Sequence, residues 1–187
     1  MNATRLFALV LGLAQVVCVV SASAHPLPSS IVTYSVDADS IDLTVTIPLH
    51  ELALALPAVR VLGKAPAEGP VAANLTPQLA TYFDDHVALL AVDQSRLALG
   101  MASAKITGAT HEDIGPYSLL VVDLSAPLLP GQNAFPPTLT YDAVMHEVRN
   151  HRAEVFLQRS GQHPQAIGVI RFDPDLGASA PLALPLP

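Results

Sequence analysis

The 187-residue chain has no tryptophan and a single cysteine, and only 13% of its residues are charged. Soluble domains usually have roughly 25% charged residues. The cysteine, Cys18, lies in an apolar N-terminal stretch, so the remaining chain has neither a disulfide nor a thiol that binds metal. Cations are also scarce, with 9 lysines and arginines against 16 acidic residues and a net charge of −7 at pH 7. This balance argues against nucleic acid and anionic membrane surfaces as partners.

Familiar catalytic motifs are missing as well. The sequence contains no G-x-S-x-G elbow, no glycine-rich phosphate loop and no zinc-type cysteine pair. The zinc-protease motif needs two histidines four positions apart, whereas His146 and His151 are five apart. A helix would separate their rings by roughly 140°, and a straight strand would place them on opposite faces. They can share a metal only in a loop or bulge, and we predict that the protein is not an enzyme.

The N-terminus has the organisation of a secretory signal peptide. Arg5 supplies a positive charge, residues 6–20 are almost entirely apolar, and Ala22 and Ala24 form the A-x-A pattern of a cleavage site. Cleavage after Ala24 predicts a periplasmic or secreted protein. It removes Arg5 and no acidic residue, so the net charge falls from −7 to −8. No later apolar run is long enough to cross a bilayer, so we predict no transmembrane segment in the mature chain.

The rest of the chain has the pattern of a mainly β domain. Residues 31–36 and 41–47 flank a turn-forming cluster, and the second run alternates strictly between apolar and polar side chains, so the two predict an opening hairpin. The apolar run Leu119–Val122 predicts a strand that is buried on both faces. Strands at this spacing predict an antiparallel β-sandwich with one or two short helices. The further strands are predicted at residues 87–92, 96–101, 104–110, 117–124, 138–142, 153–158 and 166–172.

Two helices are expected within this pattern. A short helical turn is predicted at residues 50–56, and Thr76-Pro77 predicts the start of a longer helix with Thr76 as its N-cap. His86 would end this helix, where the partial negative charge favours a cation. One helix face should pack on a sheet through Leu79, Tyr82 and Phe83. The predicted segments are a signal peptide (1–24), a β-sandwich domain (25–173) and a flexible tail rich in proline, alanine and leucine (174–187).

The seven histidines direct attention to metal binding. Cleavage after Ala24 would make His25 the first residue, with its α-amine and ring Nδ1 both available to one metal. Pro26 has no backbone N–H, which excludes a square-planar copper site built on successive amides. The chelate therefore needs further ligands, and all-nitrogen ligation suits Cu(II), Ni(II) or Zn(II). The candidate ligands are His25, His146 and His151, with His86 and Asp142 in reserve.

Several of these segments resemble one bacterial family. Ala24-His25-Pro26-Leu27-Pro28-Ser29-Ser30, the later Ile47-Pro48-Leu49-His50-Glu51-Leu52 and residues 139–151 resemble the extracytoplasmic N-terminal region of HupE/UreJ-type proteins. Members of that family are membrane proteins associated with hydrogenase and urease accessory functions and with nickel or related metals. The resemblance covers residues 24–172, without the membrane helices of the family. It implies a periplasmic module that binds Ni or Cu and works with a separate membrane transporter-type protein.

Two hypotheses remain open at this point. In the first, the protein is an exported module that binds a transition metal through His25 and partner histidines. In the second, it is a structural or interaction β-sandwich in which the histidines are incidental. A third possibility, a copper-dependent oxidase built on the terminal histidine, specifies no substrate. Metal titration discriminates between the first two.

Overall fold

The computed structural model describes residues 29–64 and 68–186, without the side chains of residues 63 and 64. The predicted signal peptide and His25 lie outside this range. Within it the protein is mainly β, as predicted, with two sheets in which antiparallel pairs dominate and three short helices. No helix in this part of the chain is both long and apolar enough to cross a bilayer.

The larger sheet has eight strands, and β1 lies near its middle. Their bounds are β1 (Ser30–Val36), β2 (Ser40–Pro48), β3 (Gly69–Pro70), β5 (Gly100–His111), β6 (Gly115–Pro127), β8 (Arg152–Leu157), β9 (Gln165–Asp173) and β10 (Ala178–Ser179). Their order is β10-β9-β8-β1-β2-β6-β5-β3. β1 and β2 form the predicted opening hairpin. β1 also pairs in parallel with β8, which the sequence pattern does not predict, and Ser30 thereby lies opposite Ala153.

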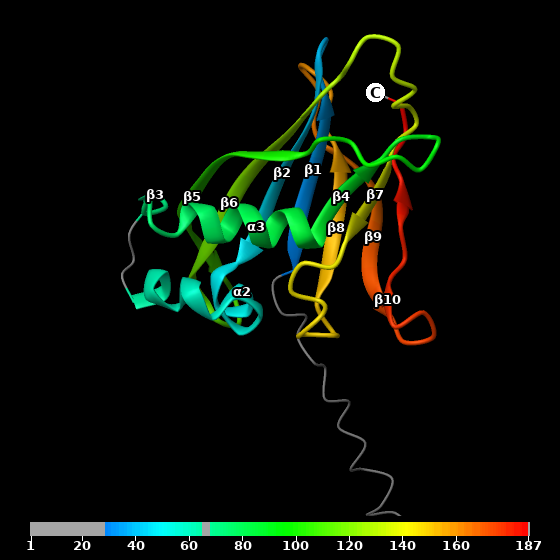
Figure 1. Ribbon diagram of the computed structural model, residues 1–187. Helices are drawn as coiled ribbons and strands as arrows, with labels where there is room; N and C mark the ends of the chain where they lie inside the picture. The colour runs from blue at the N-terminus through cyan, green and yellow to red at the C-terminus, as the bar shows by residue number, and fades with distance from the viewer. Residues whose placement is uncertain (1–28, 65–67, 187) are drawn as a thin grey trace, which may run out of the picture.

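A second layer covers this sheet. It contains a smaller sheet in the order β11-β7-β4, made of β4 (Val87–Leu90), β7 (Thr138–Tyr141) and β11 (Leu182–Ala183). In Figure 1 this sheet lies in front of β8 and β9, and helix α3 (Thr76–His86) crosses in front of β5, β6 and β2. The two remaining helices lie near one end of the larger sheet: α2 (Leu49–Ala55) follows β2 directly, and η1 (Pro57–Lys64) follows α2.

The core fills the space between the two layers. The alternation predicted for β2 is confirmed, since Ile41, Leu43, Val45 and Ile47 are each at most 1% exposed. The predicted face of α3 is buried too. Each large apolar side chain that leaves water in this way stabilises the fold by about 1.5–3 kcal/mol. The prediction that Leu119–Val122 is buried on both faces is wrong, because only Leu120 and Val122 face the core and their neighbours are half-buried.

Two further predictions about local structure are wrong. The strand predicted at 96–101 is absent, because Arg96 forms only an isolated bridge with Leu90 and β5 begins at Gly100. Thr76 is not an N-cap, because the cap position is occupied by Leu75 and no side chain bonds to it. Pro77 nevertheless lies in the first turn of α3, where its missing N–H costs nothing.

The predicted flexible tail is also wrong for the residues that the structure describes there. β10 pairs with β9, and β11 pairs with β7. Leu184 follows β11, is only 1% exposed and donates its backbone N–H to the carbonyl of Pro137 at 2.9 Å. Short strands of this kind give no periodic signal in the sequence, yet they cover two sheet edges.

Candidate functional site

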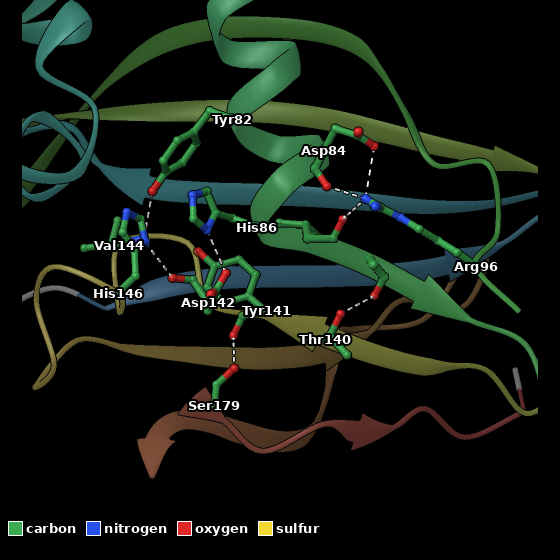
Figure 2. A network of polar contacts seen from close by, with 12 residues as sticks. Tyr82, Asp84, His86, Arg96, Thr140, Tyr141, Asp142, Val144, His146 and Ser179 are labelled. Atoms are coloured by element: carbon green, nitrogen blue, oxygen red, sulfur yellow. Dashed lines mark hydrogen bonds and ion pairs between the residues drawn. The ribbon is translucent and has the colours of Figure 1, made fainter. Parts of the chain in front are cut away.

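Three of the five predicted ligands meet where α3 ends and the loop after β7 begins. His86 is the last residue of α3, and its backbone carbonyl accepts a hydrogen bond from the N–H of Asp142 at 3.0 Å. The His86 Nδ1 lies 2.9 Å from Asp142 Oδ1. The His146 Nδ1 lies 3.2 Å from the backbone carbonyl oxygen of the same aspartate. Figure 2 shows both rings turned toward Asp142, which is therefore the common anchor of the two histidines.

These contacts fix which ring nitrogen carries the proton. A carboxylate oxygen and a carbonyl oxygen only accept hydrogen bonds, so the Nδ1 of each ring must donate. In the neutral imidazole the other nitrogen, Nε2, then carries a lone pair. Histidines that bind metals use this arrangement, with the second ring N–H held by a carboxylate or a backbone carbonyl. The structure thus presents two Nε2 lone pairs, and the described residues offer no hydrogen-bond partner to either.

The two rings are stacked on each other. Their centroids are 4.1 Å apart with an angle of 5° between the planes, and the ring of Tyr82 lies 4.6 Å from that of His86. Metal–nitrogen bonds of about 2.0–2.1 Å allow two nitrogens of one ion to be at most about 4 Å apart. The ring centroids are separated by about this distance. Because the planes are nearly parallel, a shared ion requires at least one ring to rotate.

Solvent and charge both favour a cation at this position. The His86 side chain is 21% exposed and that of Asp142 is 42% exposed, so an ion can reach His86 and Asp142 from solution. The partial negative charge at the C-terminal end of α3 and the carboxylate of Asp142 act in the same direction. In the part of the chain that the structure describes, however, no group of three or more His, Cys, Asp or Glu side chains is arranged to hold a metal. A metal bound by His86 and His146 therefore needs additional ligands.

The loop that carries Asp142 and His146 has a strained backbone. Val144 has a φ of +70°, a left-handed conformation that is unfavourable for a β-branched residue. Its side chain is fully buried, and its N–H donates to the Tyr82 hydroxyl at 2.9 Å. Strain of this kind persists only where the surroundings impose it, and it concentrates at functional sites. Burial of the Val144 side chain and the bond to Tyr82 hold the loop against α3 (Figure 2).

Replacing Tyr82 by phenylalanine tests this attachment. The change leaves the buried N–H of Val144 without an acceptor, so we expect the free energy of unfolding to fall by about 1–3 kcal/mol in urea denaturation. Burial raises the pKa of Tyr82 above its ordinary value, so the wild-type hydroxyl stays neutral across the usual pH range. Tyr117→Phe is the matched control, since this half-buried tyrosine on β6 should change stability by less than about 0.5 kcal/mol. Equal effects of the two changes would mean that the bond contributes nothing.

His151, by contrast, faces the core. It is 4% exposed, with Nε2 at 2.7 Å from the hydroxyl of Ser30 and Nδ1 bonded to the carboxylate of Glu51. Residues 142–150 do form a loop, as metal sharing by His146 and His151 would require. Both ring nitrogens of His151 are nevertheless engaged inside the protein. The structure brings together His86, Asp142 and His146 and places His151 in a separate network.

This second network joins three distant segments. Ser30 begins β1, Glu51 lies on α2 and His151 immediately precedes β8. The order Ser Oγ, His Nε2, His Nδ1 and carboxylate is that of a hydrolytic triad. Ser30 is 0% exposed, so its hydroxyl lies inside the fold, where the network joins β1, α2 and the residue that precedes β8. Sequence reasoning missed Ser30 and Glu51 because residues 100 or more positions apart give no local signal.

The network also lies close to the start of the described chain. Ser29 contacts Glu154 of β8 through its hydroxyl at 3.2 Å, and Ser30 contacts His151. Figure 1 shows the beginning of β1 beside the loop of residues 142–151. The first described residues therefore lie near this loop.

No protein-family model matches the chain, and no curated protein matches it.

Proposed function

We propose that the protein is an exported periplasmic module that binds a transition metal, Ni(II) or Cu(II), at His86 and His146. The observation that supports this most directly is the orientation of the two rings. Both hold Nδ1 against Asp142, and each therefore offers an Nε2 lone pair. Imidazole nitrogen is a preferred donor for both metals. Asp142 serves as the orienting residue, and His151 is not a ligand because both of its nitrogens are engaged.

His25 completes the ligand set in this proposal. After cleavage behind Ala24, its α-amine and Nδ1 add two nitrogens to the two from His86 and His146. His25 is four positions before Ser29, and four residues of extended chain reach about 14 Å at most. This distance is counted from the start of β1, which lies beside the loop of residues 142–151. An all-nitrogen set of four donors is typical of Cu(II) and Ni(II) sites.

The sequence resemblance extends the proposal to a partner. A module similar to the extracytoplasmic region of HupE/UreJ-type proteins would pass its metal to a membrane transporter-type protein. The acidic character of the chain, with a net charge of −7 at pH 7, is compatible with cation capture. Catalysis is not part of this function, and Ser30, the residue placed like a nucleophile, is fully buried.

Calorimetric titration of the protein that starts at His25 tests the metal site. We expect one Cu(II) or Ni(II) per chain with a dissociation constant in the micromolar range or below. The double change His86→Ala and His146→Ala should abolish this binding. Asp142→Ala should weaken it by about 10–100-fold, the usual effect of losing a group that orients a ligand. A single glycine placed before His25 should weaken it too, because the terminal amine is then displaced.

Two exposed histidines provide the controls, since any histidine binds these metals weakly. His50→Ala and His163→Ala should leave the titration unchanged. If the His86 and His146 double variant binds as well as these controls, the proposed site is wrong. If the unmodified protein retains no metal, the alternative of a structural or interaction β-sandwich is the better account of the fold.

A further inference from the structure

A second candidate site lies away from the histidine pair, at the end of the larger sheet. A hollow of about 840 Å³ separates α2 and η1 from the turn between β5 and β6. Its walls are mostly apolar and include Leu49, Ala53, Leu54, Val59, Ile114 and Pro116. Figure 1 shows α2 next to the lower ends of β5 and β6. The residues that line the hollow come from α2, η1, the turn between β5 and β6, and β6. The volume is within the range of about 300–1,000 Å³ that is typical of sites for small molecules.

Two apolar side chains of this hollow are exposed to solvent. Leu54 is 56% exposed and Ile114 is 42% exposed, and they belong to opposite walls. Leu49 and Val59, which line the same hollow, are nearly fully buried and belong to the core. The hollow is thus continuous with the core at its base and open at its rim. Apolar surface that faces water in this arrangement gains free energy when an apolar molecule covers it.

Arg60 supplies a fixed positive charge to the hollow. Its Nε donates to the backbone carbonyl of Ala53 at 3.2 Å, which anchors the guanidinium against α2. Among the described residues Arg60 has no carboxylate partner, whereas Arg96 pairs with Asp84 and Arg152 pairs with Glu154. The Nη groups of such an arginine are suited to a bidentate contact with a carboxylate. Among the described residues Arg171 of β9 also lacks a carboxylate partner, but it lies outside the hollow, so Arg60 is distinguished by its place in the apolar lining.

We propose that this hollow binds a small amphiphilic carboxylate, with the acid group on Arg60 and the apolar body between Leu54 and Ile114. The two halves of such a molecule match the two features of the hollow, its apolar walls and its one fixed charge. A free amphiphile fits better than a lipid surface, because the net negative charge of the protein opposes approach to an anionic membrane. This site does not depend on the metal proposed at His86 and His146.

Titration with decanoate, measured by displacement of a fluorescent apolar anion, tests the proposal. We expect saturable binding of one decanoate per chain, and weaker binding of the neutral decanol. Arg60→Gln should weaken decanoate binding by about tenfold or more, as expected for the loss of a charged hydrogen bond, and leave decanol binding unchanged. Leu54→Asn should weaken both. Arg171→Gln, an exposed arginine of β9 outside the hollow, is the matched control and should change neither.

Three results would overturn this inference. They are a lack of saturable binding up to millimolar decanoate, equal binding by the Arg60→Gln and Arg171→Gln variants, and a failure of Leu54→Asn to weaken binding. Co-sedimentation with phosphatidylglycerol vesicles that depends on Arg60 would also overturn it, because the occupant would then be a lipid surface. Circular dichroism checks that each variant is folded, which is expected because Arg60 and Leu54 are exposed. None of these outcomes depends on metal binding.

Discussion

Replacement of Glu51 by alanine is expected to lower the free energy of unfolding by about 3–5 kcal/mol, the usual cost of removing one member of a buried ionisable pair. The Glu51 side chain is 5% exposed and that of His151 is 1% exposed, so water cannot replace the lost carboxylate. His151 would keep only its bond to Ser30. The change should also loosen the contacts among β1, α2 and the loop of residues 142–151, which this network joins.

Urea denaturation followed by circular dichroism measures this effect. Glu51→Gln should cost less than Glu51→Ala, because the amide oxygen can still accept a hydrogen bond from the His151 ring. Glu147→Ala is the matched control, since Glu147 is an exposed acidic residue of the same loop and should change stability by less than about 0.5 kcal/mol. A double-mutant cycle with His151→Gln isolates the coupling. If Glu51→Ala costs no more than Glu147→Ala, the network does not fasten the fold.

The second large effect is expected at the C-terminal end of the chain. Leu184→Ala should lower the free energy of unfolding by about 2–5 kcal/mol, as for other buried leucines. Leu184 is 1% exposed and lies just beyond β11. Close packing continues along β11, because a Cβ added to Gly168 of β9 would lie 3.0 Å from the Leu182 side chain. The end of the chain is therefore part of the contact between the two layers.

Leu186→Ala provides the comparison for this prediction. Leu186 is two positions further along and is 60% exposed, so its truncation should change stability by less than about 0.5 kcal/mol. Both variants remove the same atoms from the same segment, and only their burial differs. Equal and small effects in thermal or urea unfolding would support a loose tail and contradict the packing of β11. A large effect confined to Leu184 would support that packing.

The contacts of Glu51 and of Tyr82 bear on the metal proposal. Glu51 and His151 hold the far end of the loop that carries Asp142 and His146, while Tyr82 holds its beginning through Val144. A loop fixed at several points keeps the backbone that carries its ligands in place before an ion arrives, so that only a ring has to rotate, which lowers the entropic cost of binding. Titration of the His86 and His146 variants distinguishes a metal site from a purely structural loop.

Much of the fold follows from local sequence pattern. The alternation of residues 41–47 determines which face of β2 is buried, because successive side chains of a strand point to opposite sides. The spacing of Leu79, Tyr82 and Phe83 likewise determines the buried face of α3. These periodicities are properties of a single segment. They need no knowledge of what packs against it, and they were sufficient to predict a mainly β protein with few helices.

The candidate site depended on contacts between segments. His86 and Asp142 are 56 positions apart, and Glu51 and His151 are 100 apart, so no local period relates them. The sequence drew attention to all five predicted ligands by residue type. Only the tertiary structure separated His146, which stacks on His86, from His151, which enters the core. The pairing of β4 with β7 places His86 beside Asp142, and the pairing of β1 with β8 places Ser30 beside His151, because strand pairing fixes which loops and termini become neighbours.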